Sequence, residues 1–233
     1  MASGRLTRSK VLAAAIALVD RQGLAALTMR RLATELGVEP MALYRYAAGK
    51  DALLDGMVEG FYAEVMDGLG KPAGDWRREL HRIATVFCEV ADRHPALLPL
   101  VVTRPLSVPM SRRPAPMLQL NERMLDQIGR AGHDPRTTLR LYRSLVGFCL
   151  GYLLVEKRPV VDNPDEADPL LRFGLHRLPV AEYPKLRELA PLLAEYDAQA
   201  ELAAGLDVLI AELPTHPGRA RRARRPAGRS GAE

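Results

Sequence analysis

Apolar residues recur at helical spacing along most of this 233-residue chain, and that periodicity is the strongest constraint on its fold. Leu12, Ile16 and Val19, for example, would share one face of a helix over residues 8–22. No segment alternates apolar and polar residues for long, and aromatic residues make up only 5% of the chain. Strands are therefore not expected, and the sequence predicts an all-α protein.

Glycines and prolines divide the rest of the pattern into further helical segments. We expect helices over residues 28–36, 40–47, 51–67, 75–93, 113–131, 134–157, 184–195 and 197–213. A short turn is expected over 95–102. Residues 158–182 hold four prolines and are expected to be mostly loop.

A glycine-rich break at residues 68–74 suggests a domain boundary. We expect an N-terminal domain with its connecting helix over 1–67 and a larger helical domain over 68–213. Residues 214–233 contain six arginines and no apolar periodicity, so a disordered tail is expected there.

The charge is distributed unevenly along the chain. Residues 1–50 hold eight basic and three acidic residues, whereas residues 51–213 hold 19 basic and 24 acidic ones. The last twenty residues are again basic. Two basic ends around a mildly acidic body favour a partner that carries phosphate, most often nucleic acid.

Residues 28–47 have the pattern of a helix-turn-helix motif. Thr28 can cap the first helix, and Gly37 permits the left-handed backbone of a tight turn. Leu32, Leu36, Val38 and Leu43 are expected to face inward. The exposed side of the second helix would then carry Met41, Ala42, Arg45 and Tyr46.

Three cations near this motif suit DNA contact. Arg45 can donate two hydrogen bonds to a guanine edge, and Arg30 can reach a base or a phosphate. Lys50 is expected at a helix N-terminus, where backbone N–H groups also favour a phosphate oxygen. The alternative for Arg30 is a place on a solvated helix face.

The segments ALTMRRLA (26–33), LGV (36–38), ALYRY (42–46) and GKDALL (49–54) follow one another in this order. Together they resemble the TetR family of bacterial transcriptional regulators, and the tetracycline-repressor-like branch in particular. The resemblance implies an all-α homodimer with an N-terminal DNA-binding domain and a larger domain for dimerisation and ligand binding.

The resemblance also extends the set of DNA-binding candidates. Tyr44 and Lys50 match positions that contact phosphate in the family, although Tyr44 could instead be a packing residue. The complete candidate set is Thr28, Arg30, Met41, Ala42, Tyr44, Arg45, Tyr46 and Lys50.

Two apolar stripes in the C-terminal half favour a four-helix interface between two copies of the chain. They consist of Leu141, Leu145, Phe148, Tyr152 and Val155, and of Leu202, Leu206, Leu209 and Leu213. The alternative is that the stripes form core within one chain.

A ligand pocket is expected between the helices over 75–93, 113–131 and 134–157. The candidates are Phe87, Cys88, Leu118, Asn121, Met124, Leu125, Arg143, Phe148 and Tyr152. Asn121 and Arg143 are the most informative of these, because a polar group on an inward face needs a partner. For each single residue, ordinary core is the alternative.

Motifs for catalysis or metal binding are not found in the sequence. The five histidines lack metal-ligand spacing, so no catalytic residue, metal ligand or cofactor is predicted. Cys88 and Cys149 are expected to be buried and inert, with a redox-sensing role as the alternative.

These features favour a ligand-responsive repressor that binds a palindromic operator in double-stranded DNA as a homodimer. An unknown small hydrophobic effector would release it. The alternatives are a ligand-independent architectural DNA-binding protein and a helical enzyme with a vestigial DNA-binding domain. With two cysteines, no signal-peptide pattern and no apolar run of about 20 residues, a cytoplasmic protein without a membrane span is expected.

Overall fold

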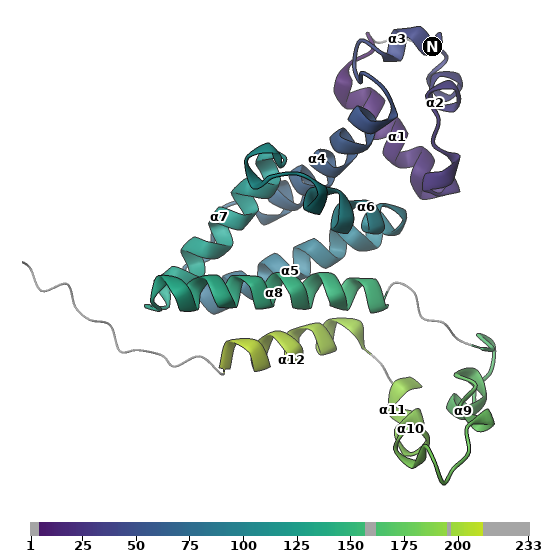
Figure 1. The fold of residues 1–233 in the computed structure, drawn as a ribbon, viewed down its shortest axis with the longest axis vertical. Helices are drawn as coiled ribbons and strands as arrows, with labels where there is room; N and C mark the ends of the chain where they lie inside the picture. The colour runs from purple at the N-terminus through teal and green to yellow at the C-terminus, as the bar shows by residue number, and fades with distance from the viewer. Residues whose placement is uncertain (1–4, 157–161, 195–196, 212–233) are drawn as a thin grey trace, which may run out of the picture.

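The computed structural model describes residues 5–156, 162–194 and 197–211, and every regular element in these ranges is helical (Figure 1). This confirms the all-α prediction. The α-helices are α1 (Arg8–Gln22), α2 (Met29–Leu36), α3 (Pro40–Leu43), α4 (Lys50–Leu69), α5 (Trp76–Arg93), α6 (Leu98–Thr103), α7 (Ala115–Arg130), α8 (Pro135–Glu156), α9 (Pro169–Arg172), α10 (Pro184–Glu188), α11 (Ala190–Ala194) and α12 (Ala198–Ala211).

Three predicted segments differ from the observed helices. The helix expected through Ala47 ends as α3 at Leu43, and the residues that follow form a tight turn in which the Tyr46 amide donates to the Leu43 carbonyl. The turn expected over 95–102 contains the α-helix α6. The helix expected over 184–195 divides into α10 and α11, because Pro191 lacks the N–H that would continue the first of them.

Helices α1, α2 and α3 form the N-terminal unit, and α1 crosses α4 at a close distance (Figure 1). The crossing depends on Gly56, where a Cβ atom would lie 2.6 Å from Cδ2 of Leu12. At the same crossing the Arg8 guanidinium lies 2.8 Å from the Glu59 carboxylate. A larger residue at position 56 would therefore have to displace the Leu12 side chain.

Helix α4 continues into the second half of the molecule, where it packs against α5, α6 and α7. Phe61 and Tyr62 of α4 meet Phe87 of α5, with ring centroids 5.3 Å apart between Phe61 and Phe87. The buried apolar residues of α1 to α8 and of α12 belong to one continuous cluster. The boundary predicted near residue 68 consequently does not separate two hydrophobic cores, and the division into 1–67 and 68–213 remains a proposal.

The C-terminal end of α4 is fastened by a buried ionic cluster. The Glu79 carboxylate is fully buried and accepts hydrogen bonds from Nε of Arg123 at 2.7 Å and Nη2 of Arg82 at 3.0 Å. The same two arginines donate to the carbonyls of Leu69 and Gly70, which lie at the end of α4. The cluster thus satisfies carbonyls that a helix terminus leaves unpaired.

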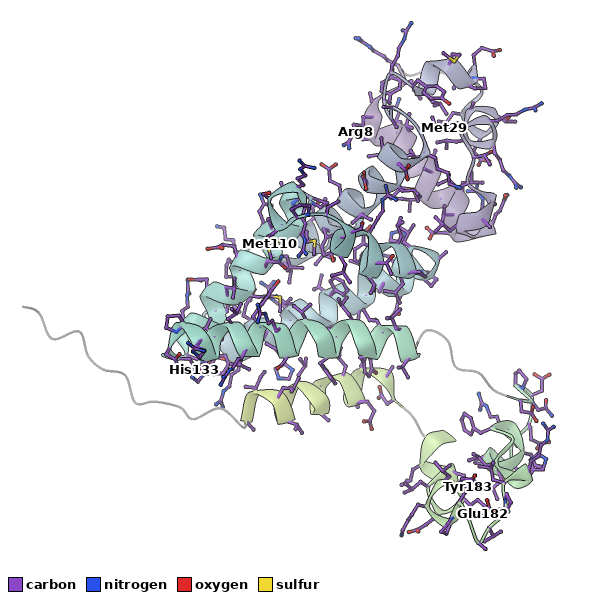
Figure 2. All side chains as sticks on the ribbon, in the orientation of Figure 1. Arg8, Met29, Met110, His133, Glu182 and Tyr183 are labelled. Atoms are coloured by element: carbon purple, nitrogen blue, oxygen red, sulfur yellow. The ribbon has the colours of Figure 1, made fainter. Side chains whose placement is uncertain are left out.

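Helices α8 and α12 lie side by side, with side chains filling the space between them (Figures 1 and 2). Leu141, Leu145, Leu202 and Leu206 are buried within the chain. The prediction that these stripes face a second copy is therefore wrong for these residues, because α12 covers α8 of its own chain. Leu213 lies outside the described residues.

The opposite face of α8 is uncovered, and its C-terminal half carries small and apolar residues. One described helical segment, Pro135–Val155, is long and apolar enough by length and composition to cross a membrane, with a mean hydropathy of 1.3. Only 17% of its apolar window is buried in the chain. The exposed residues on this face include Gly147, Gly151 and Leu154.

Candidate functional site

The predicted helix-turn-helix forms with the expected local chemistry. The Thr28 hydroxyl caps α2 by accepting a hydrogen bond from the Arg31 amide at 3.1 Å. Gly37 ends α2 in the left-handed conformation, with φ of 64°. Leu32 and Leu43 are fully buried and hold α3 against α2, so the exposed side of α3 is set by its own core contacts.

Several DNA-binding candidates are solvent-exposed on this unit. Met41 is 75% exposed and Tyr44 is 46% exposed, and the side chains of Arg30, Arg45 and Lys50 are also exposed. Within the part of the chain that the structure describes, no acidic side chain forms an ion pair with these three cations. Their charges are therefore available to an external anion.

Two candidates are less exposed than the sequence suggested. The Tyr46 hydroxyl donates a hydrogen bond to the Leu6 carbonyl at 2.9 Å, so this half-buried side chain fastens the segment before α1. The expectation that it lies on the exposed side is wrong, because the chain turns after Leu43 and carries Tyr46 inward. Ala42 is half-buried as well.

An apolar cavity of about 110 Å³ lies in the second half of the molecule, between α4, α5, α6, α7 and α8. Phe87, Asn121 and Met124 line it, as do several apolar residues of α6 and the turn after it. Figure 2 labels Met110 on the loop that leads from this turn to α7. The cavity is in the region where a pocket was predicted.

Six pocket candidates do not line this cavity. Cys88 and Tyr152 line a separate cavity of about 230 Å³ next to α12, and the ring of Phe148 packs against Gly205 of α12. Leu118 and Leu125 are half-buried outside the cavity lining. The expectation that Arg143 faces inward is wrong, because its position on α8 is exposed to solvent.

Sequence reasoning missed the other lining residues that carry chemistry. They are Tyr62 on α4, Arg113 before α7, and Tyr142 and Cys149 on α8. A usable signal was present on α8, where positions 142, 146, 149 and 150 have helical spacing. Arg113 lies in an irregular loop and gave no such signal.

The two tyrosines of the cavity are within electrostatic range of Arg113. Burial raises the pKa of Tyr62 and of Tyr142, while the positive charge of Arg113 partly opposes both shifts. Both phenols are therefore neutral hydroxyls at neutral pH. Burial also raises the pKa of the Cys149 thiol to about 12, which makes it a poor nucleophile.

The turn after α6 connects the cavity to the N-terminal end of α4. Pro105 and Leu106 line the cavity, and the adjacent Arg104 binds α4. Its Nε lies 2.6 Å from Asp55 Oδ1, and its Nη2 lies 2.9 Å from the Asp51 carbonyl oxygen. A shift of this turn would therefore act on the first two turns of α4.

Metal-binding clusters are not found in the described ranges, where no group of three or more His, Cys, Asp or Glu side chains could hold an ion. His94 instead joins two helices of the fold. Its Nδ1 lies 2.8 Å from Asp20 of α1, and its Nε2 lies 3.0 Å from Glu64 of α4.

A helix-turn-helix unit joined by one continuous helix to a helical body with an apolar cavity defines the class of ligand-binding helix-turn-helix regulators. The sequence model described as "Bacterial regulatory proteins, tetR family" matches residues 11–57. The N-terminal unit of the chain therefore matches the TetR family.

Individual relatives agree with this assignment. The chain is 38% identical over 104 residues to the HTH-type transcriptional repressor DrrR1 of Streptomyces coeruleorubidus. This match covers 45% of this chain but only 38% of that repressor. It is 28% identical to an HTH-type transcriptional regulator of Saccharopolyspora erythraea, over 91% of this chain and 86% of that protein.

A solved structure extends the similarity to the whole fold. The crystal structure of a possible TetR family transcriptional regulator from Streptomyces coelicolor A3(2) has a TM-score of 0.70 and 27% sequence identity. The match covers 88% of this chain and 97% of that chain. The cavity-bearing half is therefore part of the shared architecture.

Proposed function

We propose that the protein is a transcriptional repressor that binds operator DNA as a homodimer and is released by a small-molecule effector. The observation that carries this proposal is the set of exposed cations Arg30, Arg45 and Lys50 around α3, which form no ion pair with the residues that the structure describes. In helix-turn-helix proteins the second helix of the motif enters the major groove. The relative DrrR1 is a transcriptional repressor, which supports repression over activation.

Each side chain of the motif then has a distinct role. Arg45 donates to a guanine edge, and the exposed Met41 packs on apolar groups such as thymine methyls. Tyr44 and Lys50 contact backbone phosphates, and Lys50 does so beside the free N–H groups at the start of α4. Thr28 contributes by capping α2.

The test is operator binding by variants in which a single cation is replaced. Replacing Arg45 by alanine should weaken binding to DNA from the gene's own flanking region by about 1–3 kcal/mol, with relaxed sequence preference. Lys50→Ala should weaken binding to all sequences alike and reduce the salt dependence. Arg78→Ala removes an exposed arginine of α5 and is the control. Equal affinity of Arg45→Ala and the wild-type protein would refute the assignment of α3.

The uncovered face of α8 supports dimerisation. Gly147 and Gly151 of α8, and Ala204 and Val208 of α12, place small or apolar exposed side chains on adjacent helices. Small residues let the two helices of each subunit pack against the same pair in a second copy. Such a dimer would present two α3 helices to half-sites about 34–36 Å apart.

Sedimentation can test this interface directly. Gly151→Arg should convert the dimer into a folded monomer, because the long charged side chain would occupy the contact. Gly129→Arg, at an open position of α7, is the matched control and should remain dimeric. A dimeric Gly151→Arg variant would contradict the proposed interface.

Regulation would proceed through the turn after α6. A ligand that displaces Pro105 or Leu106 would also move Arg104, which binds Asp51 and Asp55 beside the first residue of α4. For release, the effector needs a higher affinity for the shape that cannot bind DNA. The proposal thus assigns DNA binding to residues 1–67 and effector binding and dimerisation to residues 68–213.

We further propose that the protein acts in the cytoplasm, has no membrane span and has no enzymatic activity. Its relatives are named as transcriptional regulators, which supports this. The arginine-rich residues 214–233 lie outside the described residues. Deleting them should reduce only non-specific DNA affinity. Complete loss of binding would instead favour an architectural DNA-binding protein.

A further inference from the structure

The cavity contains two buried donors that the protein itself leaves unpaired. Among the described residues, Nε of Arg113 and Nδ2 of Asn121 are buried without a hydrogen-bond partner. Asn121 is 9% exposed and lines the cavity together with Arg113. Leaving a buried donor unpaired is unfavourable, and a charged one more so. Two such donors in one cavity indicate a place for an acceptor that comes from outside the chain.

The net positive charge of the cavity lining favours an anionic ligand. No acidic side chain lines the cavity, so nothing in its lining compensates the positive charge of Arg113. This charge is close enough to Tyr62 and Tyr142 to lower the pKa of both phenols, against the larger effect of burial. The two hydroxyls remain neutral and can act as further donors.

The unpaired Nε of Arg113 indicates which kind of acceptor fits the cavity. Nε of a guanidinium lies on the edge that also carries an Nη group, and this edge binds both oxygens of a carboxylate side-on. Arg113 leaves this nitrogen unpaired, and Asn121 supplies a second unpaired donor from α7. A carboxylate, which has two oxygens and a negative charge, offers an acceptor to each donor and therefore fits them better than a single neutral carbonyl oxygen.

The remainder of the wall is apolar and suits an aromatic ring. Ile83, Phe87, Val101, Leu120 and Met124 contribute to it. The cavity volume of about 110 Å³ is comparable with that of an apolar protein cavity of about 150 Å³ that binds benzene. The cavity therefore accepts one ring before neighbouring side chains must move.

We infer that the effector is an aromatic carboxylate, with its carboxylate held by Arg113 and Asn121 and its ring among the apolar side chains. This inference rests on the proposed function, in which a ligand in this cavity controls DNA binding. Recognition of the carboxylate explains why an otherwise apolar cavity retains an uncompensated arginine.

The test compares benzoate with benzamide, a neutral probe of nearly the same shape, by titration calorimetry on the full chain. The wild-type protein should bind the carboxylate at least about 10-fold more tightly, which corresponds to about 1.4 kcal/mol. Equal affinities, tighter binding of the amide, or failure of both probes to bind at millimolar concentration would overturn the inference.

Variants locate the preference within the cavity. Arg113→Gln should abolish the preference for the carboxylate while keeping affinity for the amide, and Arg112→Gln, at the exposed neighbouring position, should retain the preference. Asn121→Asp has almost the same shape and adds a negative charge, so it should weaken carboxylate binding about 10-fold or more. Retention of the full preference by Arg113→Gln or by Asn121→Asp would also overturn the inference.

DNA binding without ligand separates this inference from the proposed function. If the protein binds DNA from its gene's flanking region but does not prefer the carboxylate, the proposed function stands and the proposed class of effector is refuted. If the protein prefers the carboxylate but binds no DNA, the cavity assignment stands and the proposed function is refuted.

Discussion

Replacing Glu79 by glutamine should destabilise the protein by about 3 kcal/mol. The carboxylate is fully buried, and it accepts hydrogen bonds from Arg123 Nε and from the Ala73 amide, each at 2.7 Å. Glutamine keeps the shape and one acceptor oxygen but removes the charge. The arginines would then remain without their shared counter-ion.

The magnitude follows from the burial of each arginine. Removing one partner of a buried ion pair costs about 3–5 kcal/mol, and Arg123, with 9% of its side chain exposed, falls in this class. Arg82 is 32% exposed, so solvent screens its charge and its share is about 1 kcal/mol or less. The retained amide oxygen offsets part of the total, which leaves about 3 kcal/mol.

Urea unfolding followed by circular dichroism at pH 7 measures this loss, at one protein concentration for all variants because the protein is proposed to dimerise. The melting temperature should fall by about 6–12 °C. Glu89→Gln, at an exposed position on the same helix, should change stability by less than about 0.5 kcal/mol. A loss below about 1 kcal/mol for Glu79→Gln would refute the reasoning.

The same variant makes a prediction about pH. Burial raises the pKa of Glu79, but hydrogen bonds from Ala73, Arg123 and Arg82 outweigh it, and the net pKa lies below the ordinary value of 4.5. A carboxyl with a lowered pKa stabilises the fold fully above the pKa of the unfolded chain, and this stability is lost as the pH falls through the folded pKa. The stability difference between wild type and Glu79→Gln should therefore be constant near neutral pH and shrink below about pH 4.5.

Three further predictions concern packing and reactivity. Gly56→Leu should destabilise by about 1–3 kcal/mol in urea unfolding, because even a Cβ there would clash with α1, whereas Gly129→Ala in an open part of α7 should stabilise by up to about 1 kcal/mol. Tyr46→Phe should cost about 1 kcal/mol in the same assay by removing its bond to a backbone carbonyl, and Tyr44→Phe, at an exposed side chain, should cost less. Cys149 should react slowly with iodoacetamide in the folded protein at pH 7, as followed by peptide mass spectrometry; labelling as fast as in urea would contradict its raised pKa.

Local signals made the N-terminal unit predictable from sequence. Thr28 and Gly37 determine the ends of α2 through short-range hydrogen bonds and backbone conformation, and both were found where expected. Tyr46 was misplaced because its orientation depends on a contact with Leu6, 40 residues away. Periodicity along α3 carries no information about such a contact.

The cavity was predicted less well, for a related reason. Helix α8 is apolar on several sides, so its pattern did not show which side faces the cavity, which side faces α12 and which side is exposed. Arg143 was therefore chosen in place of Tyr142. Arg113 reaches the cavity from an irregular loop whose path depends on tertiary packing.

Helix α4 has a consequence for how such proteins can recombine. Its Gly56 completes the packing of α1, while Phe61, less than two turns later, completes the aromatic cluster with α5. Other contacts of this helix interleave, because Asp55 binds Arg104 of the second half whereas Gly60, later on the helix, lies against Ile16 of α1, so a cut between Asp55 and Gly60 separates both pairs. To exchange the DNA-binding unit with that of a relative, α1 and α4 of the relative should therefore be transferred together. The alternative is a relative whose residue at the position of Leu12 has the same size.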